Sequence, residues 1–183
     1  VELYTQFIND AINKKLHGVD KKQNIDISSV NVNVFIDSSI PITYIHPTRI
    51  RLDFYRKLSQ ANSISEILKI EYELIDRFGS LPPELLHLVE ESKLRIHCSQ
   101  AGVSALQLKR DVLVMEFEDS LIGSRIQPFL EFVFDYFTKR EIEFWYKENK
   151  KGLLDLSIRV VSVEDIPTIL MDFFDKLFDV FFK

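Results

Sequence analysis

Residues 73–84 read Glu-Leu-Ile-Asp-Arg-Phe-Gly-Ser-Leu-Pro-Pro-Glu, and this stretch marks the end of one helix and the start of the next. Gly79 stands where the residue after a helix takes a left-handed conformation that glycine adopts without strain. Pro82 and Pro83 prevent the first helix from continuing and fix φ for a new helical start. Glu84 is favourable in the first turn of that new helix. The stretch therefore predicts two consecutive helices separated by a short turn.

The helix before Gly79 is bounded at its other end as well, because Ser63 and Glu66 have the spacing of a capping box. We expect it to run from Ser63 to Phe78. One face carries the apolar residues Ile64, Ile67, Leu68, Ile75 and Phe78, and the opposite face carries Glu66, Lys69, Glu73 and Asp76. The carboxylates of Glu73 and Asp76 are therefore expected to project side by side from the polar face.

Two motifs together resemble a known family. They are ELIDRFGSLPPE at residues 73–84 and VNVNVFIDSSIPITYIHPTRIRLDFYRKLSQANSISEI at residues 30–67. Both resemble the C-terminal regulatory domain (TRCF domain) of the bacterial transcription-repair coupling factor, Mfd. The resemblance is dense from about Val30 to Val103, and beyond it mainly the order of the elements is similar.

This resemblance implies a regulatory function. The parent protein would be an ATP-driven DNA translocase that pushes stalled RNA polymerase off damaged DNA and recruits UvrA. In the family, the two acids of the motif dock against an N-terminal module that resembles UvrB, whose basic face also binds UvrA. These acids correspond to Glu73 and Asp76, and Arg77 follows them in the motif. The domain would cover the UvrA-binding surface of that module and hold the parent inactive.

Three other interpretations remain open. Glu73 and Asp76 are also typical of an ordinary solvated helix face, and Arg77 also suits a helix C-terminus, where a cation is favourable. A patch of Arg49, Arg51 and Arg56 with Tyr55 suggests an accessory domain that contacts nucleic acid and tunes translocation. A third alternative is an oligomer-forming module that associates through the last helix.

The composition of the chain limits the classes of protein to which it can belong. The chain has 183 residues, 46% of them hydrophobic, with a net charge of −5 and a pI near 5.4, which disfavours a phosphate-binding surface. Its apolar runs are too short for a membrane span and its start lacks the pattern of a signal peptide, so we expect a cytoplasmic protein without a membrane partner. Val1 begins directly in an amphipathic pattern, which suggests a domain excised from a longer protein.

The residues of the chain do not predict an enzyme. Its five glycines are isolated and form no phosphate-binding loop, so we expect no nucleotide cofactor. Cys98 and His97 are adjacent on a predicted helix and so point about 100° apart, which does not suit a thiol–imidazole pair. The remaining histidines, His17, His46 and His87, lie in unrelated segments without partners at ligand spacing, so no metal site is expected.

The fold class expected is α+β, with a helix-rich first lobe at residues 1–102 and a second lobe at 103–183, or both as one integrated domain. The first lobe would hold a strand from Val30 to Ile36 and a helix starting at Pro47 with Ile50, Leu52, Phe54 and Leu58. A further helix would run from Pro83 to Ala101, with Gly102 as its stop. The second lobe reads as hairpin, helix, hairpin and helix.

The last helix has a broad apolar stripe that contains the phenylalanines 173, 174, 178, 181 and 182. Aspartates dominate the opposite face, whereas a membrane-surface helix carries Lys and Arg there. We expect the stripe to pack over the two hairpins, with a partner groove or self-association as the alternative.

Overall fold

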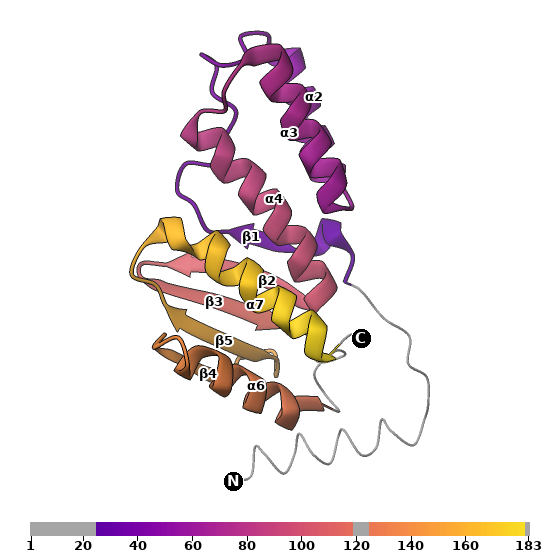
Figure 1. The fold of residues 1–183 in the computed structure, drawn as a ribbon. Coiled ribbons are helices and arrows are strands. Elements are labelled where there is room, and N and C mark those ends of the chain that lie inside the picture. Colours follow the sequence, from indigo (N-terminus) through magenta and orange to yellow (C-terminus); the bar gives the residue numbers. More distant parts are fainter. Residues whose placement is uncertain (1–24, 119–124, 182–183) are drawn as a thin grey trace.

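The computed structural model describes residues 25–118 and 125–181, and it confirms an α+β fold. The amphipathic pattern that begins at Val1 lies outside these residues. Figure 1 shows a sheet covered by helices, with two further helices beyond one end of it. The elements are η1 (Ile27–Ser29), β1 (Asn31–Asn33), α2 (Thr48–Gln60), α3 (Ile64–Phe78), α4 (Pro83–Ala101), β2 (Val103–Lys109), β3 (Val112–Phe117), α6 (Ile126–Thr138), β4 (Phe144–Glu148), β5 (Leu154–Arg159), η3 (Val163–Asp165) and α7 (Ile166–Phe181).

The sheet has five strands in the order β1-β2-β3-β5-β4. Both predicted hairpins are present, β2 with β3 and β4 with β5, and all pairings among these four strands are antiparallel. β1 is different, because it pairs in parallel with β2, with Asn31 opposite Ala105. Three helices therefore separate β1 from its neighbour in the sheet, and a strand from the first half of the chain completes the sheet of the second half.

The helix boundaries follow the predicted signals. The Ser63 hydroxyl accepts a hydrogen bond from the Glu66 N–H at 3.3 Å, and the Glu66 carboxylate accepts one from the Asn62 N–H at 2.9 Å. Gly79 has φ 88° and ψ −164°, a region that is essentially reserved for glycine, and Gly102 ends α4 in the left-handed region at φ 74°. These local signals therefore fix where α3 and α4 begin and end.

The strand predicted from Val30 to Ile36 is shorter than expected. It ends at Asn33, and the side chain of Ile36 is fully exposed. The cause is Glu91 of α4, whose Oε1 accepts hydrogen bonds from the backbone N–H groups of Val34 and Phe35, both at 3.0 Å. Because a carboxylate satisfies these donors, the chain leaves the sheet edge and turns along α4.

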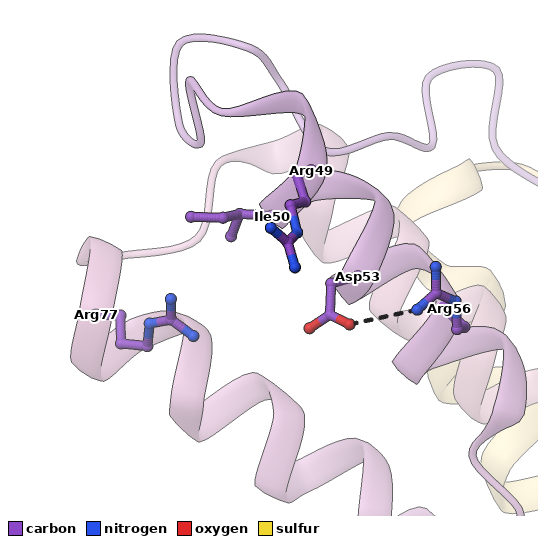
Figure 2. A pocket seen from close by; sticks show the side chains of 5 residues that line it. All are labelled: Arg49, Ile50, Asp53, Arg56 and Arg77. Atoms are coloured by element: carbon purple, nitrogen blue, oxygen red, sulfur yellow. Dashed lines mark ion pairs between the residues drawn. The ribbon is translucent and has the colours of Figure 1, made fainter.

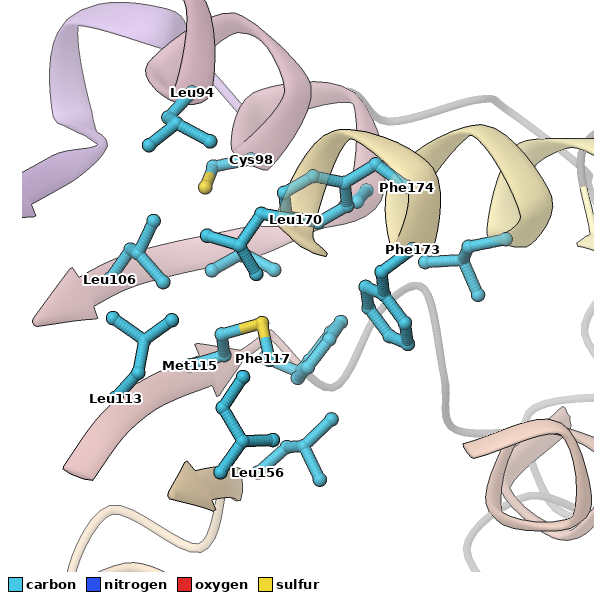
Figure 3. Close-up of a cluster of buried hydrophobic side chains, with 14 of the residues drawn as sticks. Leu94, Cys98, Leu106, Leu113, Met115, Phe117, Leu156, Leu170, Phe173 and Phe174 are labelled. Atoms are coloured by element: carbon cyan, nitrogen blue, oxygen red, sulfur yellow. The ribbon is translucent and has the colours of Figure 1, made fainter. Parts of the chain in front are cut away.

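Two hydrophobic clusters form the core, and α4 contributes to both. The larger cluster packs α4, α6 and α7 on one face of the sheet (Figure 3). The smaller cluster joins α2, α3 and the other side of α4. Leu94 and Cys98 belong to the larger cluster, whereas Val89 and Ile96 belong to the smaller one. The division of the chain at residue 102 stays a prediction, since α4 is shared between the two clusters.

Two residues that the sequence places on the apolar face of α3 are exposed instead. Leu68 and Ile75 have exposed fractions of 51% and 46%. α3 packs against both α2 and α4, so the face centred on Ile67 and Leu74, both 0% exposed, is the innermost one. The apolar side chains at Leu68 and Ile75 lie beside that face, where neither neighbouring helix covers them.

Within residues 25–118 and 125–181, no helix is long and apolar enough to cross a membrane.

Candidate functional site

The predicted interface residues lie where α3 runs beside α2, away from the sheet (Figure 1). The two helices are joined by apolar contacts, among them the edge-to-face rings of Phe54 and Phe78 with centroids 5.9 Å apart. Charged side chains surround these contacts. We call this region the α2–α3 surface and define it by Arg49, Asp53, Arg56, Lys57, Glu73, Asp76 and Arg77.

Glu73 links the two helices through ion pairs. Its carboxylate accepts hydrogen bonds from Lys57 Nζ of α2 at 2.8 and 3.1 Å, and from Arg77 Nη1, one turn along α3, at 2.7 Å. The hydrogen bond from Lys57 is the main reason that the pKa of Glu73 lies below its ordinary value, and Arg77 lowers it further. Glu73 is therefore ionised near neutral pH and already has two cationic partners within the domain.

Asp76 is in a different situation. It is exposed on α3, and within the described residues no Lys, Arg or His nitrogen lies within 4 Å of its carboxylate. The structure thus separates two acids that the sequence presents as a matched pair. Glu73 is engaged within the domain, whereas Asp76 is available to a partner.

Arg77 is held in place by several contacts. Besides the ion pair with Glu73, its guanidinium lies 5.4 Å from the ring centroid of Phe54 and 5.0 Å from that of Phe78. Cation–π contacts of this kind add a modest stabilisation and restrict the side chain. Arg77 therefore presents its remaining N–H donors from a defined position.

A hollow of about 360 Å³ lies between the two helices, lined by Arg49, Ile50, Asp53, Arg56 and Arg77. Figure 2 shows the side chains of Arg49, Asp53 and Arg77 directed toward the space between α2 and α3, with Asp53 paired to Arg56. The sequence grouped Arg49 and Arg56 in one arginine patch. The position of Arg77 opposite them was not predictable, because it depends on how α3 packs on α2.

The other members of the predicted arginine patch have structural roles. Arg51 Nη1 donates to the carbonyls of Ile45 and His46, both at 2.7 Å, which holds the segment before α2. The Tyr55 hydroxyl accepts a hydrogen bond from the Ile40 N–H at 2.7 Å. Arg51 and Tyr55 therefore bind the domain's own backbone.

The structure places Cys98 and His97 in apolar surroundings. Cys98 is fully buried, and burial raises the pKa of its thiol. His97 stacks between α4 and α7 on the rings of Phe174 and Phe178. Among the residues that the structure describes, no three His, Cys, Asp or Glu side chains are grouped so that they could hold a metal ion.

The sequence of this chain is similar to one domain family and to curated transcription-repair-coupling factors. Residues 34–123 match the TRCF domain family. The transcription-repair-coupling factor of Staphylococcus haemolyticus (strain JCSC1435) is 32% identical over 108 residues, and that of Staphylococcus aureus (strain USA300) is 28% identical over 112 residues. These matches cover 59% and 61% of this chain, and the chain spans only 9% of the length of either relative.

A crystal structure of the C-terminal domain of a transcription-repair coupling factor has the same fold. It superposes with a TM-score of 0.64 at 23% sequence identity, covering 77% of this chain and 85% of the other. The α+β architecture is therefore that of a known C-terminal domain.

Proposed function

Because the chain carries a TRCF domain and shares the fold of a transcription-repair coupling factor's C-terminal domain, we propose that it is a non-catalytic, regulatory domain of such a protein. Its α2–α3 surface docks on a UvrB-like N-terminal module of the same protein. In the docked form it covers the surface to which UvrA binds. The parent acts on DNA and on stalled RNA polymerase, and engagement of the polymerase releases the domain.

The observation that carries this proposal is the exposed position of Asp76 beside the fixed cation of Arg77. Both residues lie inside the part of the chain that matches the TRCF domain family. Ile67 and Leu74, on the core face of the same helix, are fully buried. A partner can therefore contact Asp76 and Arg77 without any change in the core.

Glu73 supports this surface in a different way from Asp76. Its carboxylate bridges Lys57 and Arg77, so it fixes the position of the arginine that the partner meets. We assign direct contact to Asp76 and Arg77 and a positioning role to Glu73.

Masking requires two states with different contacts. A ligand or partner shifts such an equilibrium only by its difference in affinity for the two states. In the closed state, Asp76 contacts a basic surface of the UvrB-like module, and in the open state it is solvated. UvrA and the α2–α3 surface then compete for one face of the UvrB-like module.

The test is Asp76→Lys in the full-length protein. Reversing the charge replaces an attraction by a repulsion across the interface, which typically costs several kcal/mol. We expect UvrA to bind this variant in a pull-down without RNA polymerase, whereas the wild-type protein binds it poorly. Glu148→Lys, which makes the same charge change at an exposed position of β4, should behave like the wild type.

Asp76→Lys alone is a better test than charge reversal at both Glu73 and Asp76, because it leaves the contacts within the domain intact. Glu73→Lys would place three cations together, since Lys57 and Arg77 already contact that position, and would disturb the packing of α2 on α3. If folded Asp76→Lys protein masks its UvrA site as well as the wild type does, the proposal is wrong and Asp76 belongs to an ordinary solvated face.

A further inference from the structure

The hollow between α2 and α3 brings three guanidinium groups around one small space. We propose that this arginine hollow, formed by Arg49, Arg56 and Arg77, binds carboxylate side chains of an acidic peptide segment from a partner protein. The proposal stands on the geometry of the hollow and does not depend on whether the domain masks a UvrA site.

The charge balance of the hollow is positive. Three arginines line it, against a single carboxylate, that of Asp53. That carboxylate is shared, since it lies 3.7 Å from both Arg56 and Lys57. Arg49 is exposed and, within the described residues, has no acidic oxygen within 4 Å. Arg77 already pairs with Glu73, and Arg56 pairs with the shared carboxylate of Asp53. Arg49 is therefore the guanidinium of the hollow that the described part of the domain leaves without an acidic partner.

The donors suit a carboxylate in their chemistry. A guanidinium is a planar fork that binds a carboxylate through two parallel hydrogen bonds, and it is less strongly hydrated than an ammonium. Arg77 is already oriented by Glu73 and by the rings of Phe54 and Phe78. Ile50 adds an apolar wall that can pack on the aliphatic part of a glutamate side chain. These features favour an acidic side chain over a fully hydrated ion.

A peptide fits the surroundings of the hollow better than a nucleic acid does. A phosphate backbone needs a continuous track of cations, because its charges repeat along its whole length. Here Asp53, Glu73 and Asp76 lie on the same α2–α3 surface, and the chain as a whole carries a net charge of −5. These acids would repel neighbouring phosphates, whereas a peptide can place acidic and basic side chains opposite their complements.

The experiment is an NMR titration of the 183-residue chain with the end-capped peptide Lys-Gly-Glu-Glu-Gly-Lys at low salt, following the Nε–Hε signals of the arginines. We expect the signals of Arg49, Arg56 and Arg77 to shift together and to saturate. The variant Arg49→Gln with Arg56→Gln should bind the peptide about fivefold more weakly, as expected for the loss of two exposed ion pairs.

A matched control removes the same charge elsewhere. Lys147→Gln with Lys150→Gln lowers the net charge equally, at exposed positions in and after β4, and should bind the peptide like the wild type. Backbone signals of the sheet report whether each variant is folded. If the double arginine variant is unfolded, Arg49→Gln alone replaces it, because that side chain is exposed.

Several results would overturn the proposal. They are arginine signals that do not shift, or equal weakening in the arginine and lysine variants, which would mean attraction by net charge alone. Tighter binding of a thymidine hexanucleotide than of the peptide at the same arginines would assign the hollow to nucleic acid. Tighter binding of inorganic phosphate would make it a phosphate site.

Discussion

His97 lies between α4 and α7 with its ring stacked on Phe174 and Phe178, at centroid distances of 6.0 and 6.1 Å. Its Nδ1 is buried and has no hydrogen-bond partner among the residues that the structure describes. Burial lowers the pKa of His97, and the nearby charge of Asp175 opposes this effect only in part. The folded chain therefore keeps this imidazole neutral to a lower pH than the unfolded chain does.

This difference predicts a pH-dependent loss of stability. Because the unfolded state binds the proton first, the free energy of unfolding should fall as the pH drops below about 6.5, the ordinary pKa of histidine. Urea denaturation between about pH 7.5 and pH 5.5 measures this, a range above that in which carboxylates such as Glu73 titrate. In His97→Leu the decline should be clearly smaller, and an unchanged pH slope would show that His97 is not its source.

Residue positions were predictable where one helix determines them. The sequence placed Glu73 and Asp76 on the polar face of α3, and the structure has Asp76 exposed and Glu73 half-buried there. The sequence could not show that Lys57 binds Glu73, because that contact joins two helices and depends on their packing. The same limit explains why the hollow with Arg49, Arg56 and Arg77 was not predicted.

At the scale of the element, α7 is part of the core. Phe173 is fully buried, and its ring contacts those of Phe132, Tyr136, Phe137 and Phe174 at centroid distances between 5.2 and 5.7 Å. The packing of this helix therefore agrees with the expectation that its apolar stripe covers the sheet.

Phe173→Ala should lower the free energy of unfolding by about 3–5 kcal/mol, because it removes a fully buried ring and leaves a cavity. Phe134→Ala on α6 serves as the control, since that side chain is 63% exposed, and should lower it by about 1 kcal/mol or less. Phe178, which is half-buried, should lie between the two. Equal urea midpoints for Phe173→Ala and the wild type would move α7 from the core to an interface.

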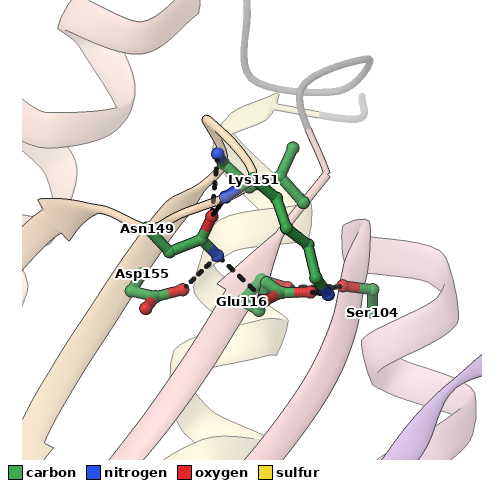
Figure 4. A network of polar contacts seen from close by, with 6 residues as sticks. Ser104, Glu116, Asn149, Lys151 and Asp155 are labelled. Carbon is green, nitrogen blue, oxygen red and sulfur yellow. Dashed lines mark hydrogen bonds and ion pairs between the residues drawn. The ribbon is translucent and has the colours of Figure 1, made fainter.

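The turn between β4 and β5 is held to the sheet by a polar network (Figure 4). Asn149 Nδ2 donates to Glu116 Oε2 at 2.8 Å and to Asp155 Oδ1 at 2.9 Å, and Lys151 Nζ donates to Glu116 Oε1 at 3.1 Å. Glu116 and Asp155 are directly opposite each other on β3 and β5. Asn149 and Lys151 therefore separate two carboxylates that would otherwise repel each other.

Asn149→Asp should destabilise the domain by about 1–2 kcal/mol near neutral pH, because it removes the donor and adds a third carboxylate. Lys150→Gln lowers the net charge by the same amount in the same turn and should change stability by less than about 0.5 kcal/mol. Equal urea midpoints for the two variants would contradict this role of the network.

Element boundaries were predictable where their signals are local. Ser63, Gly79, Pro83 and Gly102 each act through their own backbone or the adjacent turn, and each lies where predicted. The length of β1 was not predictable, because its end depends on Glu91, a side chain from a helix far along the chain. The alternation of apolar residues therefore predicted a strand as far as Ile36, although the N–H groups of Val34 and Phe35 bind Glu91 and not a neighbouring strand.

At the scale of the whole molecule, α4 is the element that joins the two clusters. It runs from the helices α2 and α3 to the sheet (Figure 1) and buries residues on both of its sides. The sequence left open whether residues 1–102 and 103–183 form two lobes or one integrated domain. The parallel pairing of β1 with β2 was also not predictable, since neither strand carries a signal for its partner. Both features couple the halves of the chain.

This coupling predicts that the two clusters unfold together. Leu74→Ala creates a cavity in the smaller cluster, where Leu74 is fully buried, and should lower the free energy of unfolding by about 2–5 kcal/mol. Trp145, the single tryptophan of the chain, lies on β4 of the sheet and reports on the other half of the molecule. Its fluorescence and the circular dichroism of the helices should therefore show one urea midpoint, lowered equally in Leu74→Ala. Tyr72→Ala, a neighbouring change on α3 at a side chain that is 73% exposed, should leave that midpoint nearly unchanged. A Trp145 midpoint that stays at the wild-type value while the helical signal is lost earlier would show that the two clusters are independent, and would support two domains divided near residue 102.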